Sequence, residues 1–158
     1  MPEEDLELDR IRQKRRRQIL SHSAKSTPER SEDLQSMNRI APQNPPGVIP
    51  LTSDSFDGFI ARHSDFPVLI DYWAEWCEPC RVTSPIVEAL ERRYRGKMVF
   101  AKVDIDENQL LGMRFNIASI PLFQIFYKGN LLDQFMGALP GQKFDEKVRK
   151  ILSDLKII

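Results

Sequence analysis

The sequence predicts an α/β domain, a mixed central β-sheet flanked by helices on both faces, behind a charged and largely disordered N-terminal extension. Every Phe, Tyr and Trp lies at or after Phe56, so the aromatic core belongs to the later part of the chain. Residues 67–74 and 98–103 form near-continuous apolar runs, which are typical of strands buried on both faces. Segments with helical apolar spacing alternate with these runs, which favours helices packed against a sheet.

The extension is expected to span residues 1–46 and the domain residues 47–158. Residues 3–20 begin with acidic and end with basic side chains, an order that suits a helix dipole, but their apolar stripe is thin and predicts only a marginal helix. Residues 21–50 are rich in Ser and Pro, as linkers are. Such a composition buries too little apolar surface to offset the entropy lost on ordering.

The first half of the domain carries the signals of helix, strand and helix. Ser53 or Asp54 can cap a short first helix. Its apolar residues are Phe56, Phe59 and Ile60. The buried strand over 67–74 follows, and then a second helix for which Gly96 is the stop. The apolar residues that we expect to form the buried stripe of this helix are Val82, Ile86, Leu90 and Tyr94.

The second half adds a strand, a hairpin and a helix. Residues 98–103 predict the second buried strand, and residues 122–127 and 131–136 predict a hairpin joined by the turn KGN. A final amphipathic helix is indicated by Phe144, Val148, Ile151, Leu152 and Leu155. The expected order is strand-helix-strand-helix-strand, a short helix, then strand-strand-helix.

The chain has only two cysteines, Cys77 and Cys80, between the strand at 67–74 and the second helix. Cys77 would lie at the helix N-terminus, where free N–H groups and the positive end of the dipole stabilise a thiolate. Pro79 suits the first helical turn, where its missing N–H leaves no bond unmade. Cys80 lies one turn away on the same face. The spacing therefore supplies the attacking and resolving thiols that dithiol–disulfide exchange requires.

Two other interpretations of the cysteine pair are less well supported. A structural zinc site needs four ligands, and the chain has only two Cys and two His. His22 lies in the linker and His63 on the first helix, so no metal site is expected in the monomer. A disulfide-stapled extracellular scaffold would need more cysteines.

Four stretches resemble the successive signature blocks of the thioredoxin family, in the same order and at matching separations. They read VLIDYWAEWCEPCRVTSPIVEAL, AKVDIDEN, IASIPLFQIFYKGN and FMGALPGQKF. The resemblance covers about residues 49–155 and implies the thioredoxin fold. The sequence departs from the family at Glu78, where the usual WCGPC site has Gly, and at Leu122, where Thr usually follows the Ile–Pro pair.

The resemblance implies catalytic roles for four residues. Cys77 would be the nucleophile and Cys80 the resolving, more buried thiol. Asp71 would accept the proton of Cys80, and burial within an apolar strand would raise its pKa towards the range of a general base. Lys102 matches the family lysine near that aspartate. The alternatives are a solvent-facing Asp71 at a strand end and a solvated strand lysine.

The resemblance also implies a substrate-binding surface. Ile120–Pro121 matches the loop whose proline is cis and faces the disulfide, although an ordinary trans turn proline is the alternative. Trp73 is expected to pack beside the site without contacting substrate. The residues expected to form the flat apolar contact surface are Trp76, Ile120, Gly137 and Ala138.

Glu78 and Pro79, between the two cysteines, are expected to tune the site. A carboxylate about 7 Å from the Cys77 sulfur would repel the thiolate by about 0.6 kcal/mol, or about 0.4 pKa units, in a water-like dielectric. Arg81 would cancel part of this repulsion. We therefore expect Glu78 to leave the chemistry intact and to favour basic partners.

The expected function is that of a protein-disulfide reductase in electron transport and cell redox homeostasis, acting on disulfide-containing proteins. The sequence has no Gly-rich nucleotide fingerprint, so a separate thioredoxin reductase is expected to recharge it, with no bound cofactor. An oxidase or isomerase would want a strongly stabilised thiolate and an export signal, and neither is apparent. The alternative from another functional class is a binding module, in which the N-terminal extension docks the domain onto a complex.

Charge and hydropathy bear on partners and location. Basic and acidic residues number 23 each, and the acidic neighbours of the basic segment 10–17 nearly cancel it, so nucleic acid is not an expected partner. The chain starts with the acidic stretch MPEEDLELD, which has no apolar run of signal-peptide length, and no stretch approaches the roughly 18 apolar residues of a membrane span. A cytoplasmic monomer is expected. The start of the extension is similar to the charged N-terminal helices of some archaeal thioredoxins.

Overall fold

The computed structural model describes residues 44–158. The helix expected over residues 3–20 and most of the linker lie outside the described residues. The described part contains the expected elements in the expected order. They are β1 (Val48–Pro50), α3 (Phe56–Arg62), β2 (Val68–Trp73), α4 (Glu78–Tyr94), β3 (Val99–Asp104), α5 (Gln109–Arg114), β4 (Leu122–Tyr127), β5 (Asn130–Met136) and α6 (Gly141–Asp154).

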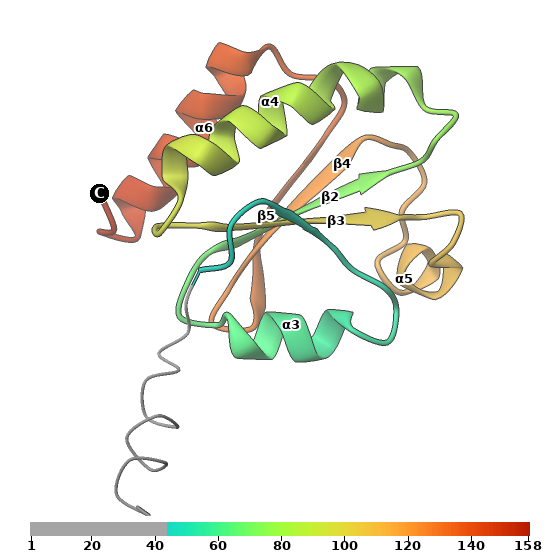
Figure 1. Cartoon of the computed structure of the whole chain (residues 1–158), viewed down its shortest axis with the longest axis horizontal. Helices are drawn as coiled ribbons and strands as arrows, with labels where there is room; N and C mark the ends of the chain where they lie inside the picture. Colours follow the sequence, from blue (N-terminus) through green and yellow to red (C-terminus); the bar gives the residue numbers. More distant parts are fainter. Residues whose placement is uncertain (1–43) are drawn as a thin grey trace, which may run out of the picture. The chain divides into compact units, whose positions relative to one another are not determined.

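The strands form one five-stranded sheet in the order β1-β3-β2-β4-β5 (Figure 1). β1, β3 and β2 are parallel, whereas β4 pairs antiparallel with both β2 and β5. The predicted mixed sheet is therefore confirmed. β2 is the central strand, and its Asp71 lies beside Lys102 of β3.

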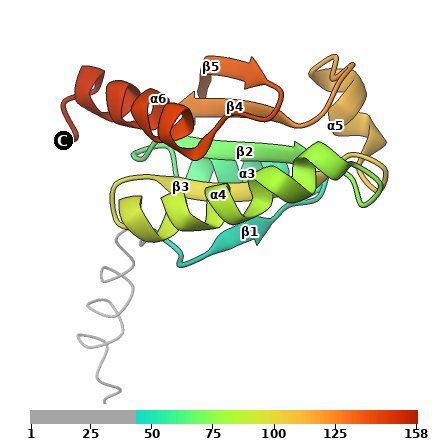
Figure 2. The ribbon, with the colours of Figure 1, turned by 90° about the horizontal axis from the view of Figure 1, so that it is seen from above.

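Helices cover both faces of the sheet, as predicted. Figures 1 and 2 show α4 and α6 on one face and α3 on the other. Successive side chains of a strand point to opposite faces, so β2 contributes to two cores. Leu69 packs in the core beneath α4 and α6, while Ile70 and Tyr72 pack in the core that includes α3. This arrangement confirms the predicted fold class.

Two local predictions about the helices are wrong. Val82 is exposed, because the side chains that reach the core from α4 come from a different stripe. That stripe consists of Cys80, Thr83, Val87, Leu90, Glu91 and Tyr94. The N-cap of α3 is Ser55, whose side chain makes no capping hydrogen bond, and neither Ser53 nor Asp54 holds that position. The Ser53 N–H is donated to the side chain of Asn108, 55 residues further along the chain.

Within residues 44–158, no helix combines the length and the apolar character needed to cross a membrane.

Candidate active site

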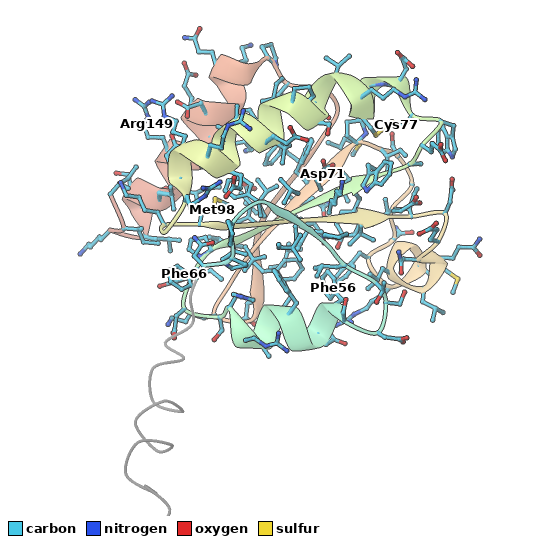
Figure 3. The ribbon with its side chains drawn as sticks, viewed as in Figure 1. Phe56, Phe66, Asp71, Cys77, Met98 and Arg149 are labelled. Atoms are coloured by element: carbon cyan, nitrogen blue, oxygen red, sulfur yellow. A yellow bond between two sulfur atoms is a disulfide. The ribbon has the colours of Figure 1, made fainter. Side chains whose placement is uncertain are left out.

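Cys77 and Cys80 form a disulfide at the start of α4 (Figure 3). Cys77 is the N-cap of the helix, and its sulfur accepts a hydrogen bond from the backbone N–H of Cys80 at 3.2 Å. Pro79 occupies the first turn, as the sequence predicted. The Cys80 N–H and the positive end of the helix dipole both favour negative charge on the Cys77 sulfur once the disulfide is reduced.

The two cysteines do not differ in burial in this oxidised state. Cys77 is 3% and Cys80 4% exposed, so the expectation that Cys80 is the more buried of the two is not met. The disulfide packs with Ala74 and Ile120 into a small apolar cluster of its own. Ile120 therefore lies against the sulfur pair, although it follows Cys77 by 43 residues and Cys80 by 40.

Asp71 is a buried acid beneath this cluster. Its side chain comes from β2, the residue is 5% exposed, and within residues 44–158 its Oδ1 has no hydrogen-bond partner. Burial raises the pKa of Asp71 to about 7, and the positive charge of Lys102 opposes part of that rise. Asp71, Lys102 and Cys80 line one cavity of about 160 Å³. A solvent-facing Asp71 is excluded.

Lys102 is half-buried and lies near both Asp71 and an aromatic ring. The Lys102 Nζ is 5.4 Å from the centroid of the Trp73 ring. Trp73 is itself half-buried and lines the cavity next to Asp71. The lysine is therefore not a freely solvated strand residue.

The loop before β4 and the end of β5 meet beside the disulfide. The Ile120–Pro121 peptide bond is cis, as the resemblance implied. The Gly137 N–H is donated to the Pro121 carbonyl at 2.8 Å. Gly137 has φ +88°, a left-handed conformation that favours glycine, and Ala138 after it is exposed.

Trp76 lies on the surface next to Cys77 and is 68% exposed. Its ring N–H is donated to the Asp106 carboxylate at 2.8 Å. Asp106 was not predicted as a site residue, because the motif DIDEN offers several acids and its order does not single out the one that meets the tryptophan.

Glu78 is exposed at the first position of α4. Its carboxylate lies 3.6 Å from the Arg81 guanidinium, which also donates a hydrogen bond to the Glu75 carbonyl at 3.1 Å. Exposed pairs of this kind contribute little free energy. The arginine nevertheless holds a positive charge beside the carboxylate between the cysteines.

Among the residues that the structure describes, no group of three or more His, Cys, Asp or Glu side chains is arranged to hold a metal ion.

Comparison with known proteins agrees with this geometry. The family model described as Thioredoxin matches residues 47–150. The chain is 40% identical to thioredoxin 1 of Nostoc sp. (strain PCC 7120 / SAG 25.82 / UTEX 2576) over 89 residues, which is 56% of this chain and 83% of the relative. It is 41% identical to thioredoxin of Chlorobaculum thiosulfatiphilum over 85 residues, 54% and 79% of the two chains. A chloroplastic M-type thioredoxin of Brassica napus is 36% identical over 104 residues, 66% of this chain and 59% of that protein.

Proposed function

The chain belongs to the thioredoxin family and performs dithiol–disulfide exchange through Cys77 and Cys80, and we propose that it works in the reducing direction on disulfide-containing proteins. The observation that carries this proposal is the cysteine pair at the N-terminus of α4, with the Cys77 sulfur accepting the Cys80 N–H. This setting stabilises an attacking thiolate without any bound cofactor.

The reaction proceeds in two exchanges. The reduced Cys77 thiolate attacks one sulfur of the substrate disulfide, a Cys77–substrate disulfide forms, and the other substrate sulfur leaves as a thiolate that takes up a proton. The Cys80 thiolate then attacks the Cys77 sulfur, and the second substrate thiolate leaves. The substrate gains two electrons and two protons, and Cys77 and Cys80 are left as the disulfide.

Asp71 is proposed as the group that accepts the Cys80 proton in the second exchange. A pKa of about 7 leaves a large part of the carboxyl ionised at neutral pH, while its basicity stays well above that of an ordinary aspartate. The cavity shared by Asp71 and Cys80 is large enough for a water molecule to relay the proton. Lys102 is proposed to hold the Asp71 pKa near neutrality, since its charge stabilises the carboxylate.

The substrate is proposed to bind over the apolar surface around the disulfide. Ile120 packs on the cysteines, and Gly137 is bonded to the carbonyl of Pro121, so an extended segment laid across them would run beside Cys77. The residues proposed to contact substrate are Trp76, Ile120, Pro121, Gly137 and Ala138. Glu78 and Pro79 are proposed to tune the site from the dipeptide between the cysteines.

The proposal also covers the partners of the protein and its location in the cell. A separate thioredoxin reductase is proposed to recharge the Cys77–Cys80 disulfide, making the chain one step in an electron-transport sequence. We propose a monomer that does not bind nucleic acid and that works in the cytoplasm, where a chain with only one cysteine pair stays reduced. Because one relative is chloroplastic, an organelle is the alternative location, and cell fractionation distinguishes it from the cytoplasm.

A reductant-coupled assay tests the proposed direction. Wild type should reduce a protein disulfide well above the rate of the reductant alone, and Cys77→Ser should abolish this excess. Cys80→Ser should instead accumulate the mixed disulfide, visible by non-reducing electrophoresis. If wild type is no faster than the reductant alone, the proposed reductase function fails, and the binding module is the alternative that remains to be tested.

A further inference from the structure

The short helix α5 presents an apolar face to solvent close to the active site. Leu110 is 66% and Met113 72% exposed, and residues three apart share one side of a helix. Leu111, between them, is buried in the core and holds the helix in place. Together these two side chains offer apolar surface that a partner could cover.

An acidic recess of about 640 Å³ borders this face. Leu110 and Met113 line it together with the carboxylates of Asp54, Asp106 and Glu107, and no basic side chain contributes to its lining. Within residues 44–158, none of these three carboxylates forms an ion pair. The recess therefore combines negative charge with apolar surface.

The basic residue of α5 does not neutralise this charge. Arg114 is bound by both oxygens of the Asp57 carboxylate, at 2.8 and 2.9 Å. Its guanidinium also lies over the rings of Phe56 and Phe115. The electrostatic potential at the recess is therefore negative and is determined by the carboxylates of Asp54, Asp106 and Glu107.

One hydrogen bond links the recess to the active site. Asp106 on its rim accepts the ring N–H of Trp76, and Trp76 precedes Cys77 in the chain. Figure 1 shows α5 and the start of α4 at the same end of the sheet. A polypeptide whose disulfide is attacked by Cys77 can therefore reach the recess with the residues that flank that disulfide.

We propose that Leu110, Met113 and the carboxylates of Asp54, Asp106 and Glu107 form a second docking surface for a basic, apolar segment next to the disulfide of a client protein. The proposal rests on the proposed reductase function. A Lys or Arg of the client would meet the unpaired carboxylates, and an adjacent Leu, Met or Phe would cover the α5 face. Acidic flanking segments would be repelled.

Three synthetic peptides with the same single disulfide test this surface. The first carries Lys and Leu beside the disulfide, the second Glu and Leu, and the third Lys and Ser. We expect wild-type kcat/KM to be highest for the Lys–Leu peptide and to fall with added salt for both Lys peptides, because surface charges are screened.

Two double variants separate the charge from the apolar face. Asp54→Asn/Glu107→Gln should lower kcat/KM for the Lys–Leu peptide about three- to tenfold at low salt and leave the Glu–Leu peptide unchanged or faster. Leu110→Ser/Met113→Ser should remove the advantage of Lys–Leu over Lys–Ser. Asp106 is left intact because it orients Trp76. Glu146→Gln on α6 and Leu132→Ser on β5 are matched exposed controls that should behave as wild type.

The outcomes separate this inference from the proposed function. If wild type reduces none of the peptides above the rate of the reductant, the reductase function fails. If wild type reduces all three, but both double variants keep the wild-type ratios between peptides, only the docking surface is refuted. The docking surface is likewise refuted if a second copy covers the α5 face, seen as a dimer that Leu110→Ser/Met113→Ser dissociates in sedimentation.

Discussion

Two buried carboxylates lie near opposite ends of α4 and behave in opposite ways. Asp71, below the start of the helix, is 5% exposed, and Glu91, in its last turns, is 4% exposed. Within the described residues Asp71 Oδ1 has no hydrogen-bond partner, and burial raises its pKa to about 7. Glu91 accepts the Gly47 N–H and two N–H groups of Arg95, each at 2.9 Å, and the Arg95 hydrogen bond chiefly lowers its pKa.

The difference separates a structural acid from a functional one. The three hydrogen bonds of Glu91 compensate its desolvation and tie the chain before β1 to α4. Asp71 has the charge of Lys102 nearby, but among residues 44–158 its Oδ1 has no hydrogen-bond partner, so its ionised form carries a net cost to folding. A buried acid that is costly to ionise, next to a reactive sulfur, is typical of an active site.

The largest expected effect is a gain in stability from Asp71→Asn. A raised pKa means that the folded state binds the proton more tightly, so folding stability falls as pH rises from about 3.8 to about 7. At pH 8 the oxidised variant should exceed the wild-type free energy of unfolding by up to about 4 kcal/mol, and at pH 3.5 the gain should be absent. Urea unfolding at both pH values measures this. Equal gains at both would mean that ionisation of Asp71 is not the cause.

Glu91→Gln should have the opposite sign and a smaller size. The variant leaves Arg95 without its charge partner and weakens two hydrogen bonds, which should lower the free energy of unfolding by about 2 kcal/mol at pH 7. Because the folded-state pKa of Glu91 is lowered, its contribution is complete above 4.5 and is lost as pH falls below that value. Disulfide reduction should be unaffected. Glu88→Gln, an exposed position on the same helix, is the control and should be neutral.

The proposed role of Asp71 as a base predicts a fall of about tenfold or more in the rate at which Cys80 resolves the mixed disulfide. Asp71→Asn should slow the attack of Cys80 on a preformed Cys77 mixed disulfide, since the proton acceptor is lost. In wild type this rate should rise with pH through about 7, and in the variant the rise should move to higher pH, where the Cys80 thiol loses its proton to solvent without the base. Single-turnover release of a fluorescent thiol gives the rate. Parallel pH profiles for both proteins would exclude Asp71 as the base.

The smallest expected effect concerns Glu78, an exposed carboxylate with none of the burial of the other two. Glu78→Gly should lower the Cys77 pKa by at most about 0.4 units, and by less at high salt. Arg81→Gln should raise it, since the guanidinium lies 3.6 Å from the Glu78 carboxylate. Thiolate absorbance of the reduced protein against pH measures both. An unchanged or raised pKa in Glu78→Gly would show that the carboxylate does not act on the sulfur.

The sequence predicted those features that depend on neighbouring residues. Apolar runs and helical spacing predicted β2, β3, β4, β5, α3, α4 and α6, whereas β1 and α5 were expected only as members of the order of elements. The CxxC between a strand and a helix predicted the Cys77 cap. Asp71 was assigned from the resemblance to the thioredoxin family, and its place inside an apolar run agreed with a buried acid. The partners of Trp76 and Glu91 were not predictable, since Asp106 and Gly47 lie 30 and 44 residues away and meet them only in the folded chain. Val82 was misassigned because the buried stripe of α4 includes the polar residues Thr83 and Glu91.

The most direct test is a titration of the Asp71 carboxyl carbon by ¹³C NMR in the oxidised protein, with Asp71→Asn to assign the signal. A midpoint near pH 7 is predicted, moving higher in Lys102→Gln because the neighbouring positive charge is lost. A midpoint near 4 would show that this buried acid is satisfied in the same way as Glu91, and would remove it as the base for Cys80.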